Sequence, residues 1–104
     1  MGEDRVIKTV RKFRRALESA DIQVEKLILF GSHAAGTARE DSDIDVVVIS
    51  PSFADKGYWE RIEILSDAIY EVFAPIEASA FTPEEWQTGE SLLVDYASNG
   101  VLVS

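Results

Sequence analysis

The stretch FGSHAAGTAREDSDID, residues 30–45, decides the fold that we expect for this chain. It begins at the end of the short apolar run KLILF, residues 26–30, which predicts a buried strand. It leads into a β-branched run at residues 44–49, which predicts a second strand. Between the two strands, residues 32–37 have room for one short helix after a turn at Gly31. A strand, a glycine turn and a second strand therefore form the centre of the predicted fold.

Hydrophobic spacing and capping residues on either side of this stretch predict the other elements. In chain order they are a helix at residues 3–19, a helix at 57–73, a weaker strand at 76–81, a helix capped by Thr82, a helix near 91–97 and an edge strand at 101–104. We expect one α/β (α+β) domain, residues 1–104, with a small mixed β-sheet and helices packed on it. Trp59 and Phe73 belong to the apolar stripe of the second long helix, and Trp59 and Trp86 are expected to be packing anchors.

The charge of the chain is unevenly distributed. The formal net charge is −9, but residues 1–15 contain six basic and two acidic side chains, so they carry +4 and the rest carries −13. An acidic surface repels phosphate backbones, so we do not expect direct binding of nucleic acid. The basic segment is interpreted as a solvated helix face, with an acidic partner or a polyphosphate as the alternatives.

Two absences narrow the class of protein. The chain has no cysteine, which excludes disulfides, thiol nucleophiles and cysteine-based zinc sites. No apolar run approaches the ~20 residues of a membrane span, and the charged start lacks the apolar core of a signal peptide. We therefore expect a cytoplasmic protein with no membrane partner.

Three aspartates, Asp41, Asp43 and Asp45, lie within five positions at the start of the second predicted strand. Strand side chains alternate between the two faces, so Asp43 and Asp45 point the same way while Ile44 points into the core. Two carboxylates that share a small space either bind a proton or need a counter-charge. A divalent cation keeps both ionised, and we predict a metal site here.

Two familiar sites with similar spacing do not fit. In an EF-hand loop the sixth position would be Val46 instead of glycine, and the twelfth would be Ser52 instead of glutamate. In a P-loop, Thr37 would stand where the phosphate-binding lysine is required. A strand followed by Gly31 and Ser32 at the start of a short helix can nevertheless hold an anion through backbone N–H groups. Phosphates and a hard cation would then lie side by side.

The combination of GS at residues 31–32 and DID at residues 43–45, with Gly36 and Ser42 between them, resembles the signature of the polymerase-β-like nucleotidyltransferases. The length of the chain and the order of its predicted elements resemble the minimal form of that family, often called the MNT domain. The resemblance covers essentially the whole chain.

This resemblance implies a set of site residues. Asp43 and Asp45 would bind two Mg²⁺ ions, and Glu77 in the third strand would be the third carboxylate, sharing a metal and helping to remove a hydroxyl proton. Gly31 and Ser32 would hold the β and γ phosphates of a nucleoside triphosphate. The implied reaction transfers a nucleoside monophosphate, AMP from ATP, to a hydroxyl acceptor and releases pyrophosphate.

The chain departs from the family pattern at two positions. Ala35 stands directly before Gly36, where members often carry arginine. Glu77 is one methylene longer than the more usual aspartate, which changes placement at a scale to which catalysis is sensitive. Reduced or lost activity therefore stays open as an alternative.

Two further polar residues of this stretch need an interpretation. Ser42 is counted with the nucleotide-binding residues, and by itself it is expected to make a local turn hydrogen bond. His33 is the only histidine of the chain, and we expect an exposed turn residue and not a general base.

Three functions remain open. The first is an enzyme that modifies a HEPN-type partner protein in a toxin–antitoxin pair, since the resemblance implies such a partner and the chain ends where the catalytic core would end. The second is a non-catalytic antitoxin whose acidic body masks a basic surface of that partner. The third is an inactive homodimer that binds nucleotide without turnover.

Overall fold

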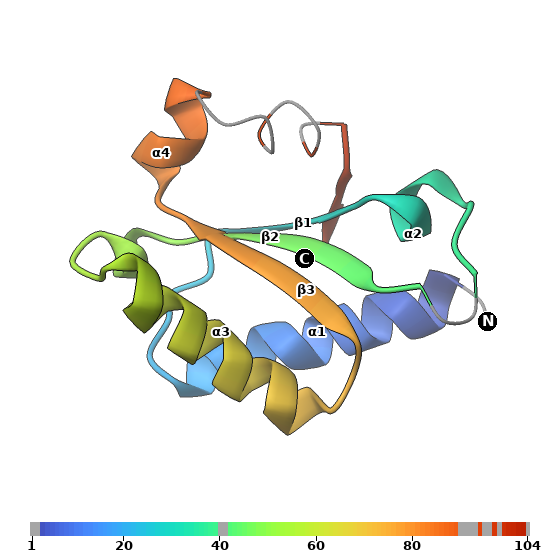
Figure 1. Cartoon of the computed structure of the whole chain (residues 1–104), viewed down its shortest axis with the longest axis horizontal. Helices are drawn as coiled ribbons and strands as arrows, with labels where there is room; N and C mark the ends of the chain where they lie inside the picture. Colours follow the sequence, from blue (N-terminus) through green and yellow to red (C-terminus); the bar gives the residue numbers. More distant parts are fainter. Residues whose placement is uncertain (1–2, 40–41, 90–93, 95–96, 98, 104) are drawn as a thin grey trace.

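The computed structural model describes residues 3–39, 42–89, 94, 97 and 99–103. Its elements follow in the order α1 (Glu3–Ser19), β1 (Lys26–Phe30), α2 (Ser32–Ala35), β2 (Ile44–Ile49), the 3-10 turn η1 (Pro51–Phe53), α3 (Tyr58–Val72), β3 (Ile76–Phe81), α4 (Pro83–Thr88) and β4 (Val101–Val103). The predicted small mixed sheet with helices packed on it is confirmed (Figure 1). The sequence did not predict η1.

The strands form one sheet in the order β3-β2-β1-β4. β1 is antiparallel to β2 and to β4, whereas β2 is parallel to β3 because α3 forms the crossover between them. The carboxyl end of β1 therefore meets the amino ends of β2 and β3 at one end of the sheet. The predicted site residues all belong to this end.

α1 and α3 pack side by side on one face of the sheet (Figure 1). The core beneath them includes the fully buried side chains of Val10, Phe13 and Leu17 from α1 and of Val46 and Val48 from β2. Burying one such side chain contributes roughly 1.5–3 kcal/mol. This packing, more than helix propensity, holds a helix as highly charged as α1 in place.

A smaller apolar cluster lies on the opposite face of the sheet. Its buried members are Ile28, Phe30, Val47, Ile49 and Ala97, and Phe81 and Trp86 pack against them. The rings of Phe81 and Trp86 meet edge to face with their centroids 5.3 Å apart, so Trp86 is a packing anchor as predicted. β2 thus has both faces covered beyond Asp45, which explains its continuous apolar run.

α3 differs from the prediction at its two ends. Gly57 and Phe73 cap the helix, and Phe73 has a left-handed backbone with φ 59°. The side chains of Trp59 and Phe73 are 76% and 86% exposed, so the prediction that they lie in the core is wrong. The helix buries the side that carries Leu65 and Ala68, and Trp59 lies about 120° around the helix from Leu65 and on the opposite side from Ala68.

Arg61 ties α3 to the loops before and after it. Its guanidinium donates to Glu85 Oε1 at 2.7 Å, to the carbonyl oxygen of Phe53 at 2.8 Å and to that of Lys56 at 3.0 Å. Glu85 and Thr82 also form a capping box at the start of α4, which confirms the predicted cap. One half-buried arginine therefore joins three segments.

The end of the chain is described only in part. The helix predicted near residues 91–97 falls largely outside the described residues. The strand Val101–Val103 pairs with β1 at the edge of the sheet, as predicted. Within the described ranges, none of the helices combines the length and the apolar character needed to cross a bilayer.

Candidate active site

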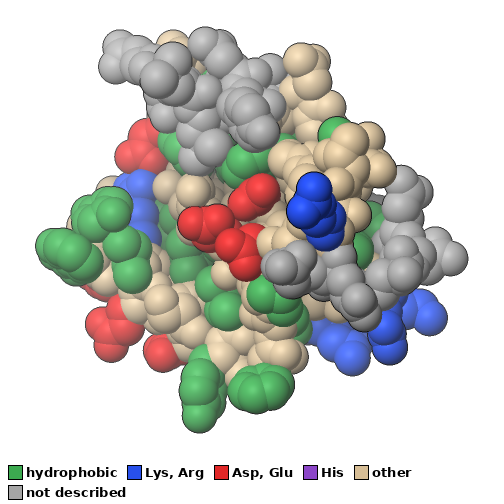
Figure 2. Space-filling model, turned by 45° about the vertical axis from the view of Figure 1, so that its right-hand side comes forward, with side chains coloured by type: hydrophobic (Ala, Val, Ile, Leu, Met, Phe, Trp, Pro, Cys, Tyr) green, Lys and Arg blue, Asp and Glu red, His purple; other side chains and the backbone are tan. Residues whose placement is uncertain are grey.

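The sheet brings the three predicted carboxylates to one place. Asp45 of β2 and Glu77 of β3 are direct partners in the parallel register, and Asp43 lies two residues before Asp45 on the loop that enters β2. The carboxyl groups of Asp45 and Glu77 are within hydrogen-bonding reach, and Asp43 is close enough to repel Asp45 electrostatically. Acidic side chains gather near the middle of the face seen in Figure 2. Asp43, which was expected at the start of the strand, lies one residue before β2 and is exposed.

The electrostatics of this cluster centre on Asp45, which is half-buried. Burial, repulsion from Glu77 and Asp43, and a hydrogen bond with Glu77 all raise the pKa of Asp45 above its ordinary value of 3.8, while His33 acts in the opposite direction. A hydrogen bond between two carboxyl groups requires that one of them holds a proton. Without a cation, the cluster therefore favours binding a proton, which is the alternative that the sequence pattern posed.

Gly31 is necessary at its position for two reasons. Its backbone, with φ 76° and ψ −152°, lies in a region that only glycine adopts readily. A Cβ atom there would overlap with Asp45 Oδ2 and lie 3.2 Å from Asp45 Cγ. The turn that was predicted to hold phosphates is therefore in direct contact with a carboxylate that was predicted to hold metal.

The short helix α2 follows this turn and ends at Gly36, whose φ of 75° is also left-handed. Ser32 is half-buried, and its hydroxyl makes no hydrogen bond within the described residues. Ala35, at the position where arginine was expected from the family pattern, is exposed. It lines a hollow of about 220 Å³ together with Gly31 and Gly100. Because alanine has no charged group, Ala35 contributes no positive charge to this hollow.

Ser42 closes the loop before β2. Its hydroxyl oxygen accepts the backbone N–H of Arg39 at 2.8 Å, and its own N–H donates to the carbonyl oxygen of Arg39 at 3.0 Å. This is the local turn hydrogen bond expected of Ser42. The hydroxyl hydrogen is still available for a second contact.

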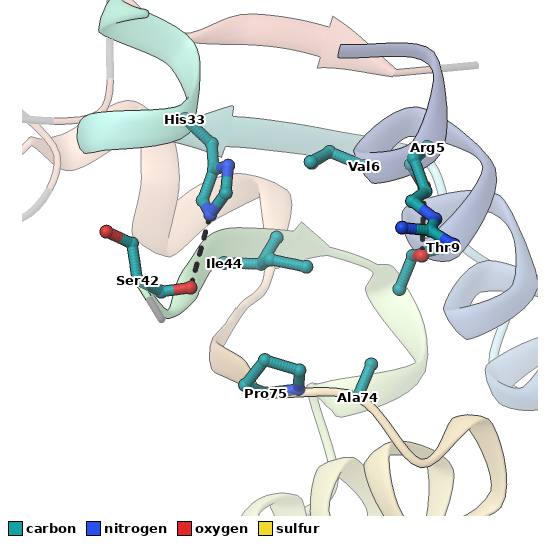
Figure 3. Close-up of a pocket in the computed structure, with 8 residues that line it drawn as sticks. All are labelled: Arg5, Val6, Thr9, His33, Ser42, Ile44, Ala74 and Pro75. Carbon is teal, nitrogen blue, oxygen red and sulfur yellow. Dashed lines mark hydrogen bonds between the residues drawn. The ribbon is translucent and has the colours of Figure 1, made fainter. Parts of the chain in front are cut away.

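His33 does not lie where the sequence suggested. It is half-buried on α2, and its Nε2 lies 3.2 Å from the carbonyl oxygen of Ser42, to which it donates when the proton is on Nε2 (Figure 3). The expectation of an exposed turn residue is therefore wrong. The contact joins the Gly31 turn to the loop that carries Asp43. Next to it lies a cavity of about 210 Å³, which Arg5 of α1 also lines.

The oxygen ligands at this site suit a hard divalent cation. Carboxylate oxygens are the protein ligands that Mg²⁺ prefers, and Asp45 and Glu77 present theirs together. Within residues 3–39, 42–89 and the shorter described pieces, however, no three His, Cys, Asp or Glu side chains are already arranged as a metal site. Exposed Asp43 would have to turn toward the other two to complete one.

Sequence comparison agrees with this geometry. The chain matches the family described as nucleotidyltransferase domain over residues 8–95. It belongs to this family. The matched range contains every predicted site residue of this nucleotidyltransferase domain, from Gly31 to Glu77.

Two solved structures have a similar fold. A candidate nucleotidyltransferase from Sulfolobus solfataricus has a TM-score of 0.71 at 20% identity, over 96% of this chain and 80% of its own. A toxin–antitoxin structure with AMP-PNP has a TM-score of 0.60 at 20% identity, over 100% of this chain and 73% of its own. At 20% identity, the similarity to these two structures shows a shared fold alone. No curated protein is similar enough in sequence to match.

Sequence reasoning missed two contacts of this region. The steric contact between Gly31 and Asp45 follows from the pairing of Phe30 with Asp45 across β1 and β2, which a register prediction could have found. The bond from His33 to Ser42 had no signal in the sequence, because it depends on how the loop between α2 and β2 folds back.

Proposed function

We propose that this nucleotidyltransferase-domain protein transfers AMP from ATP to a hydroxyl group of a partner protein, with Mg²⁺ as its cofactor. The observation that carries the proposal is the position of Asp45, which contacts the Gly31 turn on one side and Glu77 on the other. A phosphate held at the turn would lie beside the carboxylates. Such proximity of an anion site and a cation site suits phosphoryl chemistry better than any other reaction.

Each predicted residue has a role in this proposal. Asp43, Asp45 and Glu77 would hold the metal ions through carboxylate oxygens. When bound, these ions neutralise phosphate charge and activate the acceptor hydroxyl. Gly31 and Ser32 would donate backbone N–H groups, and Ser32 its hydroxyl, to the β and γ phosphates, and Ser42 would add its free hydroxyl hydrogen.

The reaction makes one bond and breaks one bond. The acceptor oxygen binds the α-phosphorus, the bond from this phosphorus to the bridging oxygen breaks, and pyrophosphate leaves. Glu77 is exposed at the start of β3, so it can take up the hydroxyl proton and release it to solvent.

The choice of ATP and of a protein acceptor rests on one similar structure. That structure is a toxin–antitoxin with AMP-PNP, an analogue of ATP. Together with the resemblance to MNT domains, it supports a HEPN-type toxin as the partner that carries the acceptor hydroxyl.

Labelled ATP and Mg²⁺, incubated with the protein and the product of the neighbouring open reading frame, test the proposal. We expect label on the partner and its loss in Asp43→Asn. Glu84→Gln removes an exposed acid of α4 outside the site and serves as the matched control with unchanged labelling. Equal labelling by Asp43→Asn and the wild type would contradict catalysis at this site.

A non-catalytic antitoxin is the second candidate. Ala35 leaves the hollow beside Gly31 without the arginine that family members often supply there. If the protein acts by masking its partner, Asp43→Asn will neutralise the toxin as well as the wild type does in a growth assay. Loss of neutralisation in this variant would favour the enzyme.

A further inference from the structure

The outer side of α3 carries large aromatic side chains that no part of the described chain covers. Trp59, Tyr70 and Phe73 are between 76% and 86% exposed, whereas Tyr58 lines a groove between α3 and β3. Exposed aromatic groups of this size are uncommon on a monomer and typical of the centre of protein interfaces. Phe73 also keeps a left-handed backbone, which a bulky residue rarely adopts. We therefore expect a binding partner on the outer side of α3.

The charges around these aromatic groups specify the chemistry of that partner. Every charged side chain exposed on α3 is acidic, namely Glu60, Glu63, Asp67 and Glu71. The helix has one basic residue, Arg61, which is turned inward and paired with Glu85. A partner for this surface must present basic groups.

The same face of the molecule offers a matching basic surface on α1. Lys8, Lys12 and Arg15 are exposed at a spacing of four and three residues, which places them on one side of the helix away from the sheet. Figure 2 shows the two signs of charge apart from each other, with acidic and hydrophobic groups at the lower left and basic groups at the lower right. Because α1 and α3 pack on the same face of the sheet, that side of the molecule contains both halves of a complementary pair.

The two helices run in opposite directions. Arg5 and Val6 near the start of α1 line the same cavity as Ala74 and Pro75, which follow the end of α3. α1 and α3 also pack directly against each other on one side of the sheet (Figure 1). A two-fold axis that runs between them, roughly along both, would place α1 of one copy over α3 of another.

We propose that the α1–α3 face binds a second copy of this chain around such an axis, so that each α1 lies on the α3 of its partner. Both contacts form at once, as a closed two-fold dimer requires. Lys8 and Lys12 then lie opposite Asp67 and Glu71, which have the same spacing of four residues. Tyr70 lies about 60° around the helix from Asp67 and is then next to the contact in both copies.

Aromatic rings and basic side chains suit each other in this contact. Lysine and arginine stack their apolar stems and cationic heads on aromatic faces. The hollow of about 330 Å³ that Tyr70, Phe73 and Pro75 line has room for one such side chain. The net charge of −9 on each copy opposes association at long range, but the repulsion is screened beyond about 8 Å at physiological salt. Close to the interface, the local charges therefore determine whether two copies bind.

The size of the face sets the expected affinity. The 17 residues of α1 span about 25 Å, and two helices side by side are about 20 Å wide. A face of this length and width has an area at the lower end of the range for specific dimer interfaces. We therefore expect a dissociation constant on the order of 10 µM. The acid cluster lies on the opposite face of the sheet from α1 and α3, so the dimer leaves it open.

Sedimentation equilibrium with charge-reversed variants tests the proposal. The wild type should pass from monomer to dimer over roughly 1–300 µM. Variant A carries Lys8→Glu and Lys12→Glu, variant B carries Asp67→Lys and Glu71→Lys, and each alone should be monomeric over this range. Mixed one to one, they should form a heterodimer, because both helix pairs then join opposite charges. Rescue by mixing is specific to the proposed pairing of α1 with α3.

The control is Glu25→Lys with Glu84→Lys, which makes the same charge change as variant B on exposed residues outside α1 and α3. It should dimerise as the wild type does. A wild type that stays monomeric throughout, single variants that still dimerise, or a mixture that fails to associate would each overturn the proposal. The wild type and both variants should also bind ATP with Mg²⁺ equally, so failure of the dimer and failure of the proposed reaction are distinguishable.

Discussion

At the scale of single residues, the site depends on how closely Gly31 and Asp45 approach each other. The glycine supplies a backbone conformation that other residues avoid, and its missing side chain leaves room for the carboxylate. The carboxylate in turn is crowded by Glu77 and Asp43, which raises its pKa. Like charges concentrated at one point are characteristic of functional sites, where stability is lower than it could be.

Gly31→Ala should destabilise the protein more than Gly36→Ala does. Gly36, with φ 75° and ψ 16°, has a left-handed helical backbone, where alanine costs about 1 kcal/mol. Gly31, with φ 76° and ψ −152°, lies in a region nearly exclusive to glycine, so the backbone cost of alanine is larger there. Only the Cβ at position 31 would meet Asp45, since nothing lies within 4 Å of a Cβ at Gly36. We expect an additional loss of about 1–3 kcal/mol for Gly31→Ala in urea unfolding. Equal losses would show that the contact with Asp45 is unimportant.

Asp45→Asn should stabilise the metal-free protein at neutral pH. The folded-state pKa of Asp45 is above its ordinary 3.8, so the folded state retains a proton that the unfolded state has already lost. Stability from this group is therefore greatest below pH 3.8 and falls as the pH rises through the folded-state pKa. Because asparagine has no titratable group, Asp45→Asn should not lose stability from this position as the pH rises. The check is thermal unfolding in EDTA: the advantage of Asp45→Asn should grow from pH 4 to pH 7, and an advantage that shrinks would contradict the crowding.

At the scale of secondary-structure elements, Arg61 is the junction that orders the end of the molecule remote from the site. It joins α3, the loop after η1 and the capping box of α4 through four hydrogen bonds. The side chain is 15% exposed and also lies 5.8 Å from the ring centroid of Phe53. The capping box alone holds the first turn of α4, so the arginine serves to attach that helix to α3.

Arg61→Lys should cost about 1–3 kcal/mol, because an ammonium group cannot replace a bidentate guanidinium. The carbonyl oxygen of Lys56 would lose its donor, whereas that of Phe53 would keep the backbone N–H of Lys56. Arg61 is the largest cause of the lowered pKa of Glu85. The stability that this pair supplies is present above the ordinary pKa of 4.5 and is lost as the pH falls through the folded-state pKa. The difference between wild type and Arg61→Lys in the free energy of unfolding, measured with urea, should thus become smaller at acidic pH. Arg15→Lys, at an exposed position of α1, is the control and should change stability by less than about 0.5 kcal/mol.

At the scale of the whole molecule, the sheet separates two functional surfaces. One face carries the acid cluster beside the Gly31 turn, and the other carries α1 and α3 with their exposed charges. Binding at the first surface should stabilise the entire fold, because the residues that we place there come from β1, β2 and β3 together and are assembled only in the folded chain.

ATP with Mg²⁺ should therefore raise the melting temperature. At about 100 times the dissociation constant, a ligand adds about 2.7 kcal/mol, which in a domain of this size corresponds to roughly 10–20 °C. Asp43 is exposed, so Asp43→Asn should leave the ligand-free melting temperature nearly unchanged and abolish most of the shift. The measurement is differential scanning calorimetry with ATP, with Mg²⁺, and with both. An undiminished shift in Asp43→Asn would remove this residue from the site.

The sequence by itself determined the order of the main helices and strands and the proximity of Gly31 to Asp45, because a strand, a glycine turn and a second strand follow one another directly. That Glu77 joins them was implied by the family resemblance, and the parallel register of β2 and β3 makes it the partner of Asp45. The boundaries of β2 and β3 were also predicted to the residue, since Pro51 lies shortly after β2, and Pro75 and Pro83 lie on either side of β3.

Only the tertiary structure decided which sides of these elements are covered. Trp59 in an amphipathic helix looks the same in sequence whether or not another segment packs on it, and the structure leaves it exposed. The partners of His33 and Arg61 lie 9 and 24 residues away, so no local spacing predicts them. The physical reason is that burial and pairing across the fold depend on how elements dock, whereas periodicity records only what each element prefers alone.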